Sequence, residues 1–92
     1  MSIVIVGGND GMARRYQDLC ESRDCKAKVF TQLRGIRAQM GQPDLVVLFT
    51  NTVSHKMVQT ATVALSGQET PVVRCRSSSL SALRKVLDQY AV

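Results

Sequence analysis

The sequence predicts an α/β fold: a small open sheet of four parallel strands in the order 2-1-3-4, with helices on both faces, as in Rossmann-like and flavodoxin-like domains. Four short apolar runs alternate with four segments whose apolar residues recur at helical spacing. Strands joined through helices run parallel, and right-handed crossovers leave this strand order as the simplest arrangement. No linker or internal repeat interrupts the pattern, so a single α/β domain is expected over residues 1–92.

The first strand and helix flank a pair of glycines. Residues 2–6 are rich in β-branched side chains, which is typical of a strand buried on both faces, and Gly7-Gly8 ends this run. Asp10 is the expected N-cap of the helix that follows. The apolar face of this helix is predicted to comprise Met12, Tyr16, Leu19 and Cys20.

The second strand and helix give a weaker pattern. Residues 25–31 alternate in polarity, with Lys26 and Lys28 on one side, as expected of an edge strand. A short helical stripe follows, although Gly35 within it lowers the helix propensity. The stripe comprises Leu33, Ile36 and Met40, and it is closed by Gly41 and Pro43.

The third strand and helix are the most strongly marked. Residues 45–49 are five consecutive apolar side chains, so this strand is expected at the centre of the sheet. Ser54 is the expected N-cap of the next helix, and Gly67 ends it. Val53 and Val58 have the spacing of a hydrophobic staple around that cap.

The fourth strand and helix follow Pro71. Residues 72–75 predict a short strand, and one serine of the triplet at 77–79 is expected to cap the final helix. Apolar residues at helical spacing then predict its buried face, which comprises Leu80, Leu83, Val86, Leu87 and Tyr90.

Composition places the chain among ordinary globular proteins with an excess of positive charge. Hydrophobic residues make up 45% and charged residues 21%, which argues against disorder. The longest apolar run is too short to cross a bilayer and no basic segment precedes the apolar N-terminal one, so a cytoplasmic location is expected. Three cysteines without a paired framework agree with a reducing compartment. The net charge of +5 favours an anionic partner.

Polar residues collect where the predicted strands end. Ligands of open α/β sheets bind beyond the carboxyl ends of the strands, where the strand order reverses, and here that point lies between the first and third strands. Three helices begin at this edge, and Lys56, Arg74 and Arg76 add full charges, so the site is predicted to favour an anion. The candidate ligand-binding residues are Gly7, Gly8, Asn9, Asn51, Ser54, His55, Arg76, Ser77, Ser78 and Ser79.

His55 is the single histidine and the one candidate catalytic residue. The positive end of its helix favours the neutral imidazole, which suits hydrogen bonding, metal ligation or base chemistry. An exposed histidine without a role is the alternative. Ser54 is expected to be a cap rather than a nucleophile, and the acid partner that a catalytic histidine needs is missing unless Asp10 reaches across the edge.

Several cofactor classes are disfavoured. The segment Gly7-Gly8-Asn9-Asp10-Gly11 does not match the dinucleotide fingerprint, and no acidic residue follows the second strand, so NAD is not expected. No P-loop lysine motif is present, which disfavours a nucleoside triphosphate, and Thr50-Asn51 stands where a phosphoacceptor domain needs an aspartate. No metal site is predicted, although metal or haem held by His55 with Cys75 or a second subunit stays open.

Three spaced motifs resemble the bacterial family known as domain of unknown function 2325. They are the strand followed by Gly7-Gly8, the Val53-Ser54-His55 segment after an apolar strand, and Arg76 to Leu87. The resemblance covers nearly the whole chain. It implies a small α/β domain of cytoplasmic bacterial origin, and it implies no particular activity. Because family members also occur attached to longer chains, it further implies a ligand-sensing or interaction module.

Three functions therefore compete. The first is a small cytoplasmic ligand-binding or regulatory domain with an anion-friendly pocket at the strand ends. The second is a small hydrolase or transferase with His55 as general base. The third is a basic module that binds nucleic acid or an acidic protein, although the chain has few aromatic residues to stack on bases. A homodimer is expected, because a four-stranded sheet leaves edges uncovered.

Overall fold

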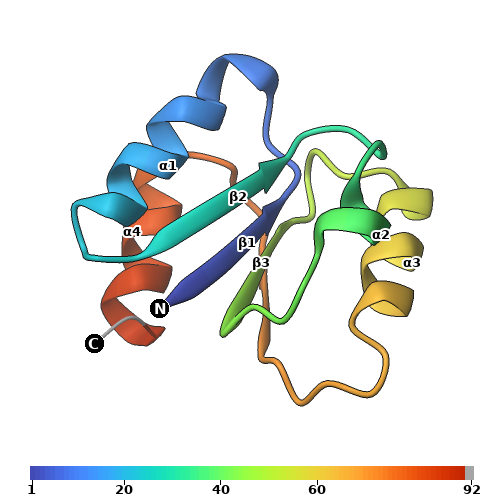
Figure 1. The fold of residues 1–92 in the computed structure, drawn as a ribbon. Helices are drawn as coiled ribbons and strands as arrows, with labels where there is room; N and C mark the ends of the chain where they lie inside the picture. The colour runs from blue at the N-terminus through green and yellow to red at the C-terminus, as the bar shows by residue number, and fades with distance from the viewer. Residues whose placement is uncertain (91–92) are drawn as a thin grey trace.

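The computed structural model describes residues 1–90 and has an open, all-parallel sheet in the order β2-β1-β3-β4. Figure 1 labels the first three strands of this order. The strands are β1 Ser2–Val6, β2 Lys26–Phe30, β3 Leu45–Phe49 and β4 Val72–Cys75. The helices are the short 3-10 helix η1 Asp10–Met12, α1 Ala13–Glu21, α2 Ile36–Gln39, α3 His55–Ala64 and α4 Leu80–Tyr90. The predicted α/β class and strand order are confirmed.

The two central strands, β1 and β3, are apolar on both faces because both faces are covered. Every residue of β3 is buried, and β1 is buried from Ile3 onward. The pair is in register from Ile3 with Leu45 to Val6 with Leu48. The prediction that residues 45–49 lie at the centre of the sheet is therefore confirmed.

Helices cover the sheet in two pairs, as Figure 1 shows. One face packs against α1 and α4 around a core that includes Ile3, Ile5, Tyr16, Phe49, Leu83 and Leu87. The other face packs against α2 and α3 around a core that includes Val4, Val6, Ile36, Leu48, Met57 and Ala61. Within residues 1–90, no helix is long and apolar enough to cross a membrane.

The start of the first helix differs from the prediction. Asp10 lies inside η1 rather than capping it, Asn9 is the N-cap, and the α-helix begins at Ala13. The carboxylate of Asp10 instead accepts hydrogen bonds from the Thr31 hydroxyl and the Gln32 side-chain amide. Asp10 therefore ties the start of this helix to the end of β2.

The second helix is shorter than its apolar stripe suggested. Gly35 is its N-cap, with a φ of 86° in the left-handed region, so the chain cannot be helical before Ile36. Leu33 consequently lies outside the helix and is 37% exposed, whereas Ile36 and Met40 are buried as expected. At the other end of the chain, Tyr90 is also more exposed than predicted, at 39%.

The glycine pair after β1 is required by close packing. Gly7 and Gly8 have φ values of 108° and 80°, which side chains rarely adopt. A Cβ atom on Gly8 would lie 2.7 Å from Cε2 of Tyr16, and that ring is fully buried and cannot move aside. A glycine is therefore required at position 8 both by the backbone angles and by the close approach of the Tyr16 ring.

Two of the three free cysteines are core residues. Cys20 and Cys25 are buried and Cys75 is partly buried. Burial, with smaller contributions from the neighbouring Cys25 and Glu21, raises the pKa of the Cys20 thiol to about 11. The Cys20 thiol is therefore protonated at neutral pH, as expected of a residue that packs rather than reacts.

The packing at Gly8 can be tested against a second glycine. Gly67 has nearly the same φ, 84°, but nothing lies within 4 Å of a Cβ built on it. We expect Gly67→Ala to lower the free energy of unfolding by about 1 kcal/mol through its backbone angles alone. Gly8→Ala should cost at least about 2 kcal/mol more, because it also overpacks the Tyr16 ring. Urea denaturation of both variants measures the difference, and equal losses would contradict this account of Gly8.

Burial of Cys20 also predicts an alkaline loss of stability. The folded pKa of about 11 lies above the ordinary value of 9.0, so below pH 9 the thiol is protonated in both states and its contribution is complete. As pH rises from 9 to 11 the unfolded chain loses the proton first, and stability falls. We expect the wild-type protein to lose about 2 kcal/mol more over this interval than Cys20→Ala, as measured by urea denaturation at each pH. Parallel pH profiles for the two proteins would refute the prediction.

Candidate functional site

The candidate site lies at the carboxyl edge of the sheet. The four strands are parallel and end there, and η1, α3 and α4 begin just beyond β1, β3 and β4 (Figure 1). All ten candidate ligand-binding residues lie in the three segments that follow these strands, which are residues 7–10, 50–56 and 76–79. We call these three segments the rim.

The rim segments after β3 and β4 are joined directly. The Thr50 amide donates to the Cys75 carbonyl at 2.7 Å, and the Thr50 hydroxyl donates to the same oxygen at 3.1 Å. These two bonds extend the pairing of β3 with β4 by one residue. They hold the start of α3 and the start of α4 at the same edge.

The crevice between β1 and β3 is filled by the protein itself. The Thr52 hydroxyl accepts a hydrogen bond from the Gly8 amide at 2.6 Å and donates to the Phe49 carbonyl at 3.2 Å. The Gly7 amide donates to the Phe30 carbonyl at 2.8 Å. The two glycines therefore lie at the predicted edge, but both of their amides are already engaged within the chain.

Tyr16 closes the other side of the rim. Its hydroxyl donates to the Ser78 carbonyl at 2.6 Å, and its ring lies 5.2 Å from the ring of Phe49. Burial raises the pKa of Tyr16, against a smaller lowering by the bond to Ser78, so the hydroxyl keeps its proton and donates. Tyr16 thus connects α1 to the segment that precedes α4. Neither this contact nor the role of Thr52 was predicted from the sequence.

Most of the rim serines have structural partners. Ser54 is confirmed as an N-cap, because its side chain accepts a hydrogen bond from the Met57 amide at 3.1 Å. Ser79 accepts in the same way from the Ala82 amide at 3.1 Å, as expected of one serine in the triplet. The Ser77 hydroxyl donates to the Ser79 hydroxyl at 3.1 Å. Ser77 is exposed and Ser78 is partly exposed.

His55 is exposed at the first position of α3. Its Nε2 lies 3.2 Å from the side-chain amide nitrogen of Gln59, which donates to this ring nitrogen in the tautomer that carries its proton on Nδ1. The ion pairs among residues 1–90 are Arg14 with Asp18 and Arg23 with Asp88, so within this part of the chain His55 has no carboxylate partner. Asp10 is bonded to the end of β2 instead.

The charge at the rim is positive. Lys56 and Arg76 are both exposed and form no ion pair within the described part of the chain, and Asn9 and Asn51 of the rim are also exposed. The first amides of α3 and α4 have no partner inside their own helices and give these ends a partial positive charge. Among residues 1–90 no group of three histidine, cysteine or acidic side chains is placed to hold a metal ion.

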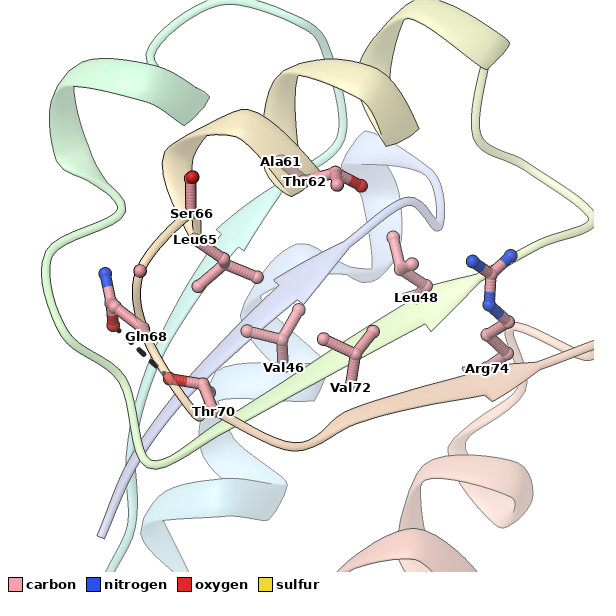
Figure 2. Close-up of a pocket in the computed structure, with 11 residues that line it drawn as sticks. Val46, Leu48, Ala61, Thr62, Leu65, Ser66, Gln68, Thr70, Val72 and Arg74 are labelled. Atoms are coloured by element: carbon pink, nitrogen blue, oxygen red, sulfur yellow. Dashed lines mark hydrogen bonds between the residues drawn. The ribbon is translucent and has the colours of Figure 1, made fainter.

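A groove away from the rim was not predicted. It runs between α3 and the edge strand β4, as Figure 2 shows, and has a volume of about 460 Å³. Val46, Leu48, Leu65 and Val72 provide its apolar lining, and Arg74 lies at one end. The i, i+2 spacing of Val72 and Arg74 on a predicted strand places them on one face of that strand. Whether that face was covered could not be known without the positions of the helices.

Comparison with known proteins identifies the family. No curated protein and no solved structure gave a match. Residues 2–90 match the model of a family described as uncharacterized protein conserved in bacteria, DUF2325. This match covers nearly the whole chain and agrees with the resemblance seen in the three sequence motifs. The chain therefore belongs to the bacterial DUF2325 family.

Proposed function

We propose that this chain is a small ligand-binding or regulatory domain that holds an anionic ligand on the rim of its sheet. The observation that carries the proposal is the direct connection of Thr50 to Cys75, which brings the serine-capped starts of α3 and α4 to one edge. Two helix N-termini that open at the same edge provide unpaired amides and partial positive charge for an anion.

The charged side chains of the rim strengthen this proposal. Arg76 follows β4 directly and Lys56 lies in the first turn of α3, so both add full positive charge near the helix ends. Asn51, His55 and Ser77 are exposed polar side chains in the same segments. The acidic residue of the rim, Asp10, is bonded to Thr31 and Gln32. An anion at this edge therefore meets the two cations Lys56 and Arg76 against the single carboxylate of Asp10, and the balance is attractive.

The geometry favours binding over catalysis. A general base is usually oriented by a partner that stabilises its protonated form, and it works best where water is excluded. His55 has Gln59 rather than a carboxylate beside it, and its side chain is open to solvent. Gly7, Gly8 and Thr52 have filled the crevice that would otherwise shelter a substrate. The rim is consequently an open surface on which a ligand rests.

Inorganic phosphate is a direct probe of the rim. A phosphate concentration ten times the Kd would add about 1.4 kcal/mol to the free energy of unfolding. For a chain of this size, that corresponds to a rise in Tm on the order of 5–10 °C. We expect this rise in the wild-type protein, measured by thermal denaturation in phosphate against chloride at equal ionic strength, and we expect most of it to vanish in Lys56→Gln/Arg76→Gln.

The matched control is Arg84→Gln/Lys85→Gln, which removes the same charge from exposed positions of α4. Phosphate also stabilises proteins by exclusion from their surface, and that contribution is common to all three proteins. The control variant should therefore keep the full phosphate effect. Equal rises in Tm for the wild type and both double variants would contradict binding at the rim. Turnover of a phosphoester that His55→Ala abolishes without a change in Tm would favour an enzyme instead.

A further inference from the structure

The groove between α3 and β4 combines an apolar floor with a single cation. Val46 and Leu48 of β3 and Val72 of β4 form the floor, and Leu65 overhangs it from the end of α3 (Figure 2). Val72 is 43% exposed although it is apolar. Its exposure follows from its place on an edge strand, whose face on the α3 side is not fully covered by a helix. Apolar surface of this kind gains free energy when a ligand removes it from water.

The two ends of the groove differ. At one end the Thr70 hydroxyl is within hydrogen-bond distance of the Pro43 carbonyl, at 3.2 Å, and of the Gln68 side-chain oxygen, at 3.3 Å. The side-chain amide nitrogen of Gln68 donates to the Gly41 carbonyl at 3.0 Å, so the lining at this end is polar and uncharged. At the other end Arg74 lines the groove, is exposed, and has no ion pair within residues 1–90. An anionic group of an occupant would therefore lie beside Arg74, with its apolar part along the floor.

The size of the groove fits the aliphatic chain of a small carboxylate. The strand part of its floor runs from Val72 to Arg74, which is roughly 7 Å at about 3.3 Å per residue, and Gln68 and Thr70 extend the lining beyond it. The volume of about 460 Å³ lies within the range of small-molecule sites. No acidic side chain lines the groove, so a carboxylate at the Arg74 end meets attraction without competing charge.

We propose that this groove binds an aliphatic carboxylate, with the hydrocarbon chain on Val46, Leu48 and Val72 and the carboxylate on the Arg74 guanidinium. This site is separate from the rim and does not depend on the anion proposed there. A second copy of this chain would bring another net charge of +5 towards Arg74. Charge complementarity therefore favours the small carboxylate.

Titration of the isotope-labelled protein with decanoate, followed by amide chemical shifts, tests the proposal. We expect saturable shifts that are largest at Leu48, Leu65, Val72 and Arg74, and small shifts at rim residues. Arg74→Gln should weaken decanoate binding roughly tenfold or more, because it removes a charged hydrogen-bond donor. Arg84→Gln, which removes the same charge from an exposed position of α4, should leave the affinity unchanged.

Decanol distinguishes the contribution of the apolar floor from that of the Arg74 charge. It offers the same chain without the charge, so we expect it to bind more weakly than decanoate and to bind wild type and Arg74→Gln equally. Val72→Thr keeps the shape and strand propensity of the residue but makes the floor of the groove less apolar. It should therefore lower the affinity for both decanoate and decanol severalfold.

Several results would overturn the proposal. They are shifts centred on the rim, equal losses of affinity in Arg74→Gln and Arg84→Gln, or equal binding of decanoate and decanol by the wild type. A groove occupied by a second copy would show concentration-dependent shifts at β4 without added ligand, and decanoate would fail to produce the pattern above. Wild-type and variant spectra with the dispersion of a folded protein show that any loss is one of binding.

Discussion

The placement of the Tyr16 ring is the constraint on which the carboxyl edge of this sheet depends. The ring is fully buried, lies beside Phe49, and occupies the space that a side chain at Gly8 would need. Its hydroxyl then fixes the carbonyl of Ser78. One residue of α1 thereby sets the turn after β1 and the segment before α4, which are far apart in the sequence. The identity of Gly8 and the direction in which α4 starts both follow from this contact.

Because of the same packing, the candidate site lies further from the sheet than the crevice in which open α/β sheets usually bind ligands. Open α/β sheets commonly bind ligands in the crevice where the strand order reverses. Here the Thr52 hydroxyl bridges the Gly8 amide and the Phe49 carbonyl, so that crevice is occupied by protein. The amides and side chains still free to meet a ligand lie further out, at the starts of α3 and α4. The glycines that looked like a ligand cradle are thus part of the wall behind the site.

The sequence was sufficient wherever one local pattern determined the outcome. Five apolar residues at 45–49 required burial on both faces, and Ser54 required only a helix to cap. The sequence was insufficient where the contacts of a side chain depend on residues that are distant in the chain. Asp10 is drawn away from capping by Thr31 and Gln32, which β2 brings beside it. The two hydrogen bonds of the Thr52 hydroxyl, to Gly8 and Phe49, form only because the carboxyl ends of β1 and β3 lie close together. The groove depends on which face of β4 the helices leave open, and no residue pattern along the strand specifies that.

The distribution of charge bears on the kind of anion this chain can meet. A nucleic-acid backbone is held by cations along one continuous surface, since each phosphate contact adds to the affinity. The cations here are separated by the fold: Lys26 and Lys28 lie on β2, at the opposite edge of the sheet from β4. Even near neighbours diverge, because Arg74 lines the groove on the α3 face while Arg76 follows the strand onto the rim. A net charge that is divided among separate surfaces suits small anions bound one at a time better than a long polyanion.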